Sequence, residues 1–596
     1  MRNTGIHKIL PFSILIFFLM TCCLSSAGLS ADLPSDAGKE HPHLSEKPYE
    51  DGIELCNAAW DDLSGLASPV EGTPESAAPP RSLPSVLISW SDGGKPFTVS
   101  PGYGKDPLDA VHDACGRAEK VGNLRYLLID LIREVSERKP LEGASYIQLE
   151  PGLEGLILEG DPPAYVFTPS ELIFSGTMDE KGRIPMAGLE ELVRKKAGKV
   201  FLSPLNRNST VRSFYSNAVF CDGEQVLPLY RGHRMISFPE RGLLLESIAI
   251  GGRYLAGSVL PGGRFVYSYQ ADRDRNNRGY NILRHAGTIY AMLEVYEFTG
   301  DREILERAIQ AFEHLEASFF KATIKGISVG MIVEDGYLKL GGNALALLAM
   351  TKYTSLTGDD RFRDEMELLA RWMYLTQGEK GDFLVHKQSW PQGKVSDFES
   401  SYYPGEAIFS LVRFHGIDGN PLWLDVAEKA ARYLILERDK GKPLSRLPHD
   451  HWLLYGLNEL YRFRKDDLYL QHGFRIADAI TGSQNMSPQF PDWMGSYYRP
   501  PRSTPTATRS EGLVAAYRLA RDHGFPDRAE AYLQAVEQGI AFQLMTQVFP
   551  ESAFYFPDPH QAMGGFRESL TASEIRIDYV QHNLSSIIGY LNETAE

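Results

Sequence analysis

Histidines and carboxylates recur at wide intervals through the second half of this sequence. His285, His451 and His582 fall at the start of stretches with helical spacing, and Glu406 and Glu511 do the same. Histidine titrates near neutral pH, which makes it the side chain best suited to proton transfer there. Paired carboxylates are the usual acid and base of glycoside hydrolysis. The principal catalytic candidates are therefore Glu406, His451, Glu511 and His582.

Two aspartates and two arginines accompany these residues. Asp450 directly precedes His451, and Asp578 lies four residues before His582, so both aspartates are further catalytic candidates. Arg284 and Arg509 are either anion clamps for a substrate or ion-pair partners of nearby carboxylates. A carboxylate at a helix N-terminus also has a structural interpretation, since it interacts favourably with the helix dipole by about 0.3–1 kcal/mol.

The same segments predict neither a catalytic metal nor another cofactor. None of these helices has the His-x-x-x-His spacing that places two imidazoles on one metal ion. The histidines are therefore interpreted as acid–base groups.

Aromatic residues are frequent in the segments between the predicted helices. An aromatic face can stack on the C–H face of a pyranose, and a guanidinium can bind sugar hydroxyls or a uronic carboxylate. A carbohydrate is therefore the predicted substrate or ligand. The predicted binding residues are Arg284, His285, Asn343, Tyr267, Tyr280, Tyr403, Trp390, Trp493 and Arg509.

Helical hairpins are predicted to position these groups. Between Ile282 and Tyr296, apolar residues recur at steps of four and three, which is typical of one face of a helix. Gly300 suits the position after that helix, and Asp301 can cap the next one. Four similar hairpins follow. They are predicted at 345–356 with 361–375, 406–414 with 422–436, 452–463 with 470–480, and 512–521 with 528–546.

Two further helices, at 242–255 and 579–591, have no partner next to them in the sequence. If they pair with each other, they close a ring of six hairpins. Such hairpins need neighbours, because one hairpin cannot bury its own apolar face. An open solenoid is the alternative, and it would more often show a fixed period. The sequence thus predicts a mainly α fold, an (α/α)6 toroid, over residues 240–594.

The inner helices of such a toroid run parallel, so their N-termini share one face. Free N–H groups and partial positive charge at helix N-termini suit anionic or hydroxyl-rich ligands. Six inner helices are predicted to begin near His285, Asn343, Glu406, His451, Glu511 and His582.

This region resembles the six-hairpin superfamily of carbohydrate-active proteins, which includes glycosidases, the glucuronyl C5-epimerase catalytic domain and sugar 2-epimerases. The resemblance is carried by Thr-Gly-Asp turns, by Tyr-Pro-Gly-Glu at 403–406 and by Arg-Ser-Glu-Gly at 509–512. It implies a hydrolase, or an epimerase or lyase, that acts on a poly- or oligosaccharide by acid–base chemistry. A non-catalytic glycan-binding or polysaccharide-assembly factor is the alternative.

The first 27 residues have the pattern of an export signal. Arg2 and Lys8 precede a run of twelve apolar residues, and Ser25 and Ala27 suit the −3 and −1 positions of a cleavage site. Twelve apolar residues are too few for a permanent membrane span. The protein is therefore predicted to be exported to the periplasm or the extracellular space. Lipid attachment at Cys22 is the alternative, and it is the only membrane association predicted.

Two segments separate the signal from the toroid, so the chain is predicted to be multidomain. Residues 28–84 are rich in Pro, Ser, Ala and Glu and predict a disordered tether without a packed core, with one short helix at 53–66 as an option. Limited proteolysis should then leave a product that starts near Ser85. Strand-like runs at 86–90 and 126–132 and a helix at 107–118 predict a small α+β domain over residues 85–235.

Charge and cysteine content narrow the class of protein. A net charge of −16 argues against nucleic acid as a partner, because like charges repel. Beyond the signal the chain has only Cys56, Cys115 and Cys221, too few for a disulfide scaffold. An oxidising compartment permits one bridge, although buried inert thiols are the favoured interpretation. The sequence indicates no oligomeric state.

Overall fold

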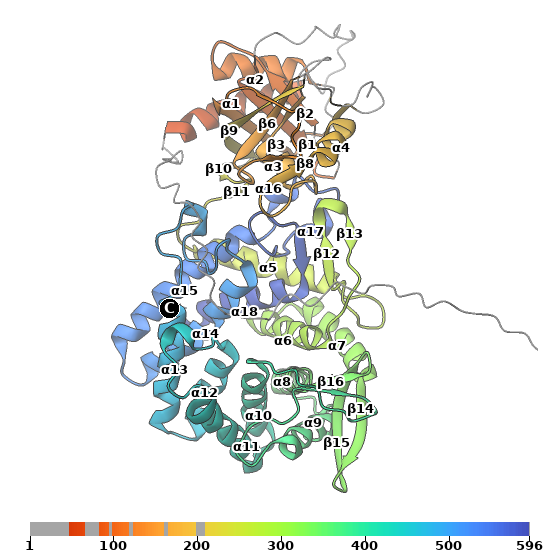
Figure 1. Cartoon of the computed structure of the whole chain (residues 1–596), viewed down its shortest axis with the longest axis vertical. Helices are drawn as coiled ribbons and strands as arrows, with labels where there is room; N and C mark the ends of the chain where they lie inside the picture. Colours follow the sequence, from red (N-terminus) through yellow and green to blue (C-terminus); the bar gives the residue numbers. More distant parts are fainter. Residues whose placement is uncertain are drawn as a thin grey trace, which may run out of the picture. The chain divides into compact units, whose positions relative to one another are not determined.

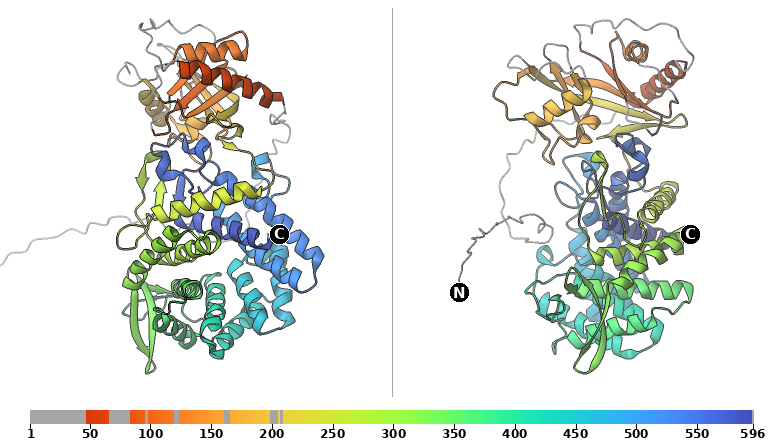
Figure 2. Two further views of the ribbon diagram at one scale, coloured as in Figure 1. Left: turned by 180° about the vertical axis from the view of Figure 1, so that it is seen from behind. Right: turned by 90° about the vertical axis from the view of Figure 1, so that its right-hand side faces the viewer.

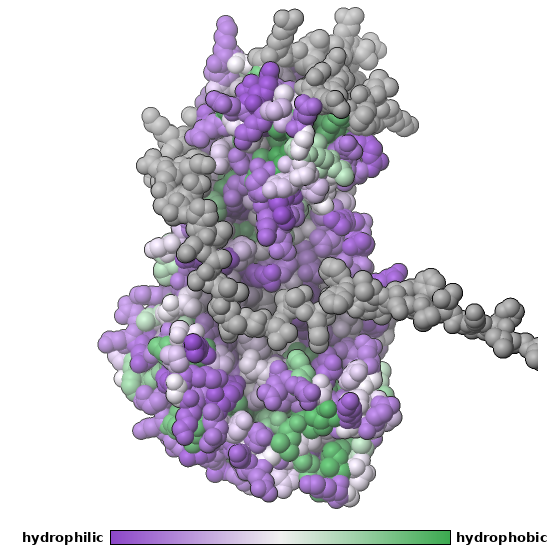
Figure 3. All heavy atoms as spheres, viewed as in Figure 1, coloured by the Kyte–Doolittle hydropathy of each residue, from purple (hydrophilic) through white to green (hydrophobic). Residues whose placement is uncertain are grey.

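The computed structural model describes residues 47–65, 83–94, 98–118, 123–159, 165–197, 205 and 209–594. The predicted export signal lies outside these residues. None of the described helices is both long and apolar enough to cross a membrane. Among the residues coloured in Figure 3, hydrophilic residues predominate over hydrophobic ones.

The elements up to residue 234 build an antiparallel sheet with four helices. The main strand order is β11 (His233–Arg234), β10 (Val226–Tyr230), β9 (Thr210–Cys221), β3 (Tyr126–Val135), β1 (Val86–Ser91) and β2 (Thr98–Gly102). Strands β4 (Lys139–Pro140) and β6 (Glu154–Glu159) also pair with β9, β7 (Tyr165–Phe167) pairs with β6, and β5 (Tyr146–Gln148) pairs with β8 (Arg183–Pro185). The helices are α1 (Lys47–Gly65), α2 (Pro107–Gly116), α3 (Pro169–Ile173) and α4 (Met186–Ala197).

The two faces of this sheet belong to different hydrophobic cores. Leu127 and Ile129 of β3 pack with residues of α1 and α2, which lie on the same side of the sheet (Figure 2). Leu128, between them, points the other way, and with Phe220 of β9 it joins the large core of the helical region. Successive side chains of a strand point to opposite faces, so one strand serves both cores.

A buried ion pair and aromatic contacts join the sheet to the helical region. The guanidinium of Arg231 donates to Asp492 at 2.7 Å, and the side chains are 2% and 0% exposed. Phe174 stacks on Tyr555 with ring centroids 5.4 Å apart. Because an isolated buried charge costs several kcal/mol, Arg231 and its partner need each other.

Helix α1 corrects the prediction that residues 28–84 contribute no packed core. Leu55, Cys56 and Leu63 of α1 are buried in the core that α1 shares with α2 and the sheet. These residues recur at helical spacing, a signal that the surrounding Pro- and Ser-rich composition obscures.

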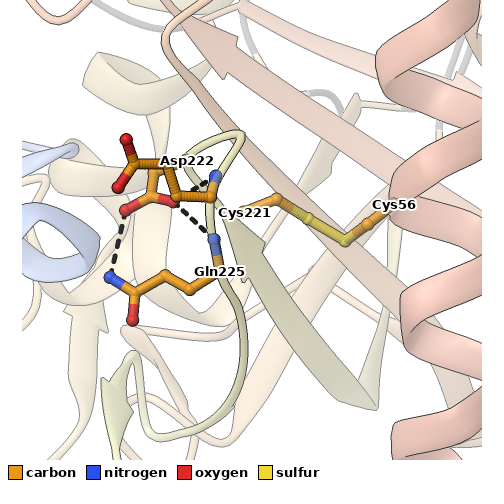
Figure 4. Close-up of a disulfide and its surroundings, with 5 residues drawn as sticks. Cys56, Cys221, Asp222 and Gln225 are labelled. Carbon is orange, nitrogen blue, oxygen red and sulfur yellow. Dashed lines mark hydrogen bonds between the residues drawn. A yellow bond between two sulfur atoms is a disulfide. The ribbon is translucent and has the colours of Figure 1, made fainter.

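A disulfide fixes α1 to the sheet. Cys56 is bonded to Cys221, the last residue of β9 (Figure 4). The next residue, Asp222, braces the turn after β9, since its carboxylate accepts from the backbone N–H of Gln225 at 2.9 Å. Two of the three cysteines are therefore bridged, and the expectation of inert thiols holds only for the buried Cys115.

Twelve helices form the region from 241 to 594, and the predicted (α/α)6 toroid is confirmed. The inner helices are α6 (Ile282–Thr299), α8 (Leu340–Thr357), α10 (Tyr403–Asp418), α12 (His451–Phe463), α14 (Ser503–Asp522) and α18 (Ile577–Thr594). The outer helices are α5 (Arg241–Gly257), α7 (Arg302–Ala317), α9 (Arg363–Thr376), α11 (Pro421–Tyr433), α13 (Asp467–Thr481) and α15 (Pro526–Thr546).

Each inner helix packs against the next, and α18 packs against α6, which closes the ring (Figure 1). Helix α5 packs against α18, so the first and last helices pair as predicted. Inner helices are buried nearly all round: every residue of α8 from Leu340 to Tyr353 is buried, whereas the outer helix α9 buries one face.

The turns inside the hairpins have the predicted chemistry. Gly300 and Gly358 end α6 and α8 in the left-handed region, with φ of 71° and 72°. Glycine adopts this conformation without the steric cost that a Cβ would add. After Gly300, the Asp301 carboxylate caps α7 by accepting from the backbone N–H of Glu303 at 3.0 Å.

Short elements in the connections complete the fold. They are β12 (Ser268–Gln270), β13 (Arg275–Asn276), β14 (Phe319–Ile324), β15 (Ile327–Glu334), β16 (Tyr337–Lys339), β17 (Lys387–Ser389), β18 (Glu574–Arg576), α16 (Pro550–Ala553) and α17 (Pro559–Ala562).

One predicted helix start is wrong. Helix α14 begins at Ser503, so Glu511 lies in its third turn and not at its N-terminus. The polar residues before Gly512 resembled a loop, yet they continue the helix. The Thr506 hydroxyl, for example, donates back to the carbonyl of Arg502 at 2.9 Å.

Removal of the disulfide should destabilise the protein. Replacing Cys56 and Cys221 by Ser is expected to lower the free energy of unfolding by about 2–4 kcal/mol, because the bridge closes a long loop. Thermal unfolding measures this: reductant should lower the Tm of the wild type but not of the double variant. Cys115→Ala is the control and should keep the response to reductant. An unchanged wild-type Tm in reductant would contradict a stabilising bridge.

Candidate functional site

The first turns of the inner helices approach one another closely. A Cβ on Gly341 of α8 would lie 2.3 Å from Oε2 of Glu406 on α10 and 2.6 Å from Cδ1 of Leu283 on α6. A Cβ on Gly405 of α10 would lie 2.6 Å from the backbone N of Leu453 on α12. Gly405 is required, because a side chain there would collide with the backbone of the next helix, whereas a side chain at Gly341 would displace the side chains of Glu406, Leu283 and Tyr403. These helices therefore begin at the same end of the ring.

Three of the predicted catalytic residues meet where α12, α14 and α18 pack together. Nδ1 of His582 lies 3.2 Å from each carboxylate oxygen of Glu511. Nε2 of His451 lies 3.6 Å from Oε2 of Glu511, and the two imidazole rings are 5.5 Å apart, centroid to centroid. We call these three residues the His–Glu–His cluster. It forms although Glu511 is not at a helix N-terminus.

Burial and mutual charge shift the pKa values of the two histidines in opposite directions. Burial lowers the pKa of His451 well below its usual range, and the neighbouring His582 and Arg509 lower it further. Burial also opposes the charged form of His582, but the Glu511 carboxylate outweighs it and raises the pKa of that imidazole. Burial raises the pKa of Glu511 despite His582. The environment therefore favours the neutral form of His451, and Glu511 favours the charged form of His582.

The surroundings leave His451 available for proton transfer. Both of its ring nitrogens are buried, and neither has a hydrogen-bond partner among the described residues. The ring of Trp452 lies 4.9 Å from that of His451 and 6.3 Å from that of His582. The ring of Trp452 thus lies beside both imidazoles and contributes to their burial, which strengthens the electrostatic interactions between them.

The same cluster is a candidate metal site. One possible ligand atom from each of the three residues lies within 4.8 Å of the others, and no other such group occurs among the described residues. Two imidazoles and a carboxylate suit Zn²⁺ with an open position. A protonated His582 cannot be a ligand, however, so metal binding would have to displace its proton. The expectation of no metal stays a prediction.

Glu406 and Asp450 lie on adjacent inner helices and differ in role. Oε2 of Glu406 is buried without a partner among the described residues. Burial, and then the negative charge of Asp450, raise the pKa of Glu406 well above its usual range, so Glu406 is a neutral acid. Asp450 caps α12 by accepting from the Leu453 backbone N–H at 3.0 Å, and burial raises its pKa to about 6 despite Arg438.

Asp578 is held by two arginines. Its carboxylate lies 3.1 Å from Arg284 on α6 and 2.5 Å from Arg576, so the closing contact of the ring is an ion-pair network. Burial favours the neutral acid, but Arg284 and Arg576 outweigh it and lower the pKa of Asp578. Asp578 is thus an ionised anchor, and Arg284 has the ion-pair role that the sequence left open.

His285 and Asn343 contact secondary-structure elements outside the cluster. The ring nitrogens of His285 lie 2.7 Å from the Tyr280 hydroxyl and 2.9 Å from the Ala311 carbonyl on the outer helix α7. Asn343 accepts from the backbone N–H of Ile332 on β15 at 2.8 Å. These contacts brace the hairpins, and the structure does not bring His285 or Asn343 into the His–Glu–His cluster.

The predicted aromatic residues occupy separate places. The Tyr267 hydroxyl accepts from Arg284. Trp390 lies 6.2 Å from Phe320 of β14, centroid to centroid, and Trp493 lies 5.0 Å from Phe490. The tryptophans therefore pack on phenylalanines of the connecting segments.

Tyr403 opens α10 and lies between two aromatic rings of the preceding connection. Its ring is 6.2 Å from that of His386 and 5.9 Å from that of Phe398. The Tyr403 ring also limits the space beside Gly341 of α8, at 2.6 Å from the position of an added Cβ.

Arg509 brings in residues that were not predicted. Its Nε donates to Nδ1 of His449 at 3.0 Å and its Nη2 to the Tyr498 hydroxyl at 3.1 Å. His449 and Trp452 lie within two residues of His451 in the sequence, so their proximity to the site could have been predicted. Of these three residues, only His451, at the start of the helix, was named as a candidate.

No protein-family model matches the sequence, and no curated protein matches it. Solved structures with a similar fold include a cellobiose 2-epimerase from Bacillus thermoamylovorans B4167, at 13% identity and a TM-score of 0.47, over 60% of this chain and 100% of that one. A D-mannose isomerase is similar at 14% identity and 0.44, over 60% and 100% of the two chains. A family 76 glycoside hydrolase from a bovine Bacteroides thetaiotaomicron strain is similar at 12% and 0.42, over 79% and 97%. The likeness is one of fold.

The protonation of the cluster can be measured without a substrate. NMR titration of the imidazoles should give His582 a pKa above 6.5, because Glu511 stabilises its charged form. In Glu511→Gln the largest effect that raises the pKa of His582 is removed, while burial and Arg284 still lower it, so this pKa should fall below its wild-type value. His523→Asn, at an exposed site, is the control. A His582 pKa that Glu511→Gln leaves unchanged would contradict the pairing.

Proposed function

We propose that this protein is an exported enzyme that acts on a poly- or oligosaccharide by proton transfer at the His–Glu–His cluster. The observation that carries the proposal is the geometry of the cluster, in which one carboxylate, Glu511, lies beside the imidazoles of both His582 and His451. The pKa values of these two imidazoles are shifted in opposite directions, which suits one to act as acid and the other as base. A base and an acid 5.5 Å apart, ring to ring, can act on neighbouring atoms of one bound sugar.

Carbon-acid chemistry fits this pair best, and it indicates an epimerase, isomerase or lyase. His451 would take the proton from a carbon next to a carbonyl or carboxylate, while His582 would give its proton to the oxygen on which charge develops. If the intermediate turns within the site, His451 can return its proton to the opposite face of that carbon while His582 takes back the proton from oxygen, which gives the epimer. If a leaving group departs instead, it takes the proton held by His451, the oxygen returns its proton to His582, and the lyase product results. Glu511 takes no part in these proton transfers but stabilises the charged form of His582.

The raised pKa of Glu406 supports hydrolysis as a second candidate function. A carboxyl group that stays protonated can donate to a glycosidic oxygen, as an inverting or retaining glycosidase requires. The partner carboxylate would be Asp450, which is fully buried and already caps α12. This commitment of Asp450 makes hydrolysis the weaker candidate.

Export is supported by two independent features. The N-terminal residues have the charge and apolar pattern of a signal, and the Cys56–Cys221 bridge is of a kind that persists in oxidising compartments.

Acid–base variants test the proposal once a substrate is known. Mass spectrometry of products, over neutral and uronic-acid oligosaccharides in ²H₂O, should reveal turnover together with deuterium incorporation at carbon. His451→Asn and His582→Asn should then lose about 10²- to 10⁴-fold in kcat, as removal of a general acid or base does. His523→Asn should keep full activity.

Each other outcome has a definite meaning. Hydrolysis products without deuterium at carbon, and a loss in Glu406→Gln that exceeds the loss in both histidine variants, would favour the hydrolase. Chelation that abolishes activity, with recovery on addition of Zn²⁺, would contradict metal-free proton transfer. Glycans that bind but are never converted would leave the alternative of a binding or assembly factor.

A further inference from the structure

A cavity of about 420 Å³ lies beside the start of α12, where the His449 side chain meets α14. It is lined by His449, Gly482, Ser483, Gln484, Asn485, Tyr497, Tyr498, Arg499 and Arg509. Two of these residues are arginines and none is acidic. In a chain with a net charge of −16, a cavity wall with this balance is locally positive.

Arg509 is a buried cation with no carboxylate partner among the described residues, and it is only 8% exposed. Its three hydrogen bonds go to neutral acceptors, namely His449, the Tyr498 hydroxyl and the Pro505 carbonyl. Burial and the nearby Arg509 lower the pKa of His449 to about 4, so this imidazole adds no charge near neutral pH. A guanidinium has five N–H donors, so donors remain on both terminal nitrogens.

The tyrosines hold this guanidinium in place. Its carbon lies 5.0 Å from the centroids of both the Tyr497 and Tyr498 rings. Tyr498 has a φ of 72°, a conformation that is costly for a residue with a bulky side chain and is kept only where the surroundings demand it. The buried hydroxyl of Tyr497 has no hydrogen-bond partner among the described residues, so it is a further unused donor.

Arg499 gives the cavity its second positive charge. It is exposed, and its Nε donates to Asn485 at 3.1 Å. The described residues give it no ion-pair partner either. Two guanidiniums that lack acidic partners, together with a neutral imidazole and a free phenol, are the donor set that an oxyanion requires.

We propose that this cavity binds the carboxylate of an acidic sugar and thereby sets the substrate class of the proposed enzyme. That the bound molecule is a sugar rests on the proposed function. The positive charge and the hydrogen-bond donors of the cavity do not depend on that function. Arg509 and Glu511 share helix α14, but side chains two residues apart on a helix point to different sides. Arg509 lies near enough to His451 for its charge to lower the pKa of that imidazole, so an anion held by Arg509 would be bound in the neighbourhood of the His–Glu–His cluster.

The test uses the full chain and three probes at matched ionic strength: D-glucuronate, D-glucose and inorganic sulfate. NMR follows the side-chain N–H signals of arginine. Glucuronate should shift the signal of Arg509, glucose should not, and sulfate should shift it at a higher concentration than glucuronate. Arg509→Gln should weaken glucuronate binding by about 10-fold or more, since charge-assisted hydrogen bonds are the strong ones. Arg521→Gln, on the same helix but exposed and paired with Glu593, is the matched control.

Tyr497→Phe provides a second variant that removes one hydroxyl and leaves the packing intact. It should weaken glucuronate binding less than Arg509→Gln, with an unchanged Tm. Equal binding of glucose and glucuronate, or no effect of either variant, would overturn the proposal. Stronger binding of sulfate than of glucuronate would also overturn it, because the cavity would then be a site for free anions.

The two proposals fail separately. If neutral oligosaccharides are converted and glucuronate does not bind, the anion site is wrong and the proton-transfer function stands. If glucuronate binds through Arg509 and no acidic glycan is ever converted, the anion site stands and the enzymatic function is wrong.

Discussion

Close packing of parallel inner helices is the constraint on which this structure depends. At Gly405 the backbone of the next helix comes so near that no side chain fits between them, and at Gly341 the side chains of α6 and α10 fill the space. Such contacts hold the N-terminal ends of α6, α8, α10 and α12 at one level of the ring. Polar groups from segments more than a hundred residues apart can then meet, because the backbone and not a flexible loop positions each of them.

This placement has an electrostatic cost that the side chains offset in different ways. Asp578 stays ionised because Arg284 and Arg576 compensate its burial. Glu406 has no such partner and is neutral instead. In the His–Glu–His cluster one carboxylate favours the charged form of one imidazole, while burial favours the neutral form of the other. Burial alone would discharge every group, so the reactivity of this end of the ring comes from the uneven distribution of partners.

Much of the fold follows from the sequence, since apolar periodicity and Gly-Asp turns are local signals. The hairpins, their turns and the pairing of α5 with α18 were all predictable in this way. The role of His285 was not predictable from the sequence. It occupies a position equivalent to that of His451 at the start of a helix, yet its ring forms a hydrogen bond with the outer helix α7. The start of α14 was missed for a related reason. A polar stretch such as Arg509 to Glu511 is indistinguishable from a loop until its tertiary partners are known.

Strand β3 illustrates how far the two halves of the chain depend on each other. Leu127 belongs to the core of the sheet domain, and the adjacent Leu128 belongs to the core of the toroid. A fragment that begins at residue 240 would lose Leu128 and Phe220 and would leave Asp492 without Arg231. Expression of the toroid without the preceding sheet would therefore expose an apolar patch and leave Asp492 without its cation.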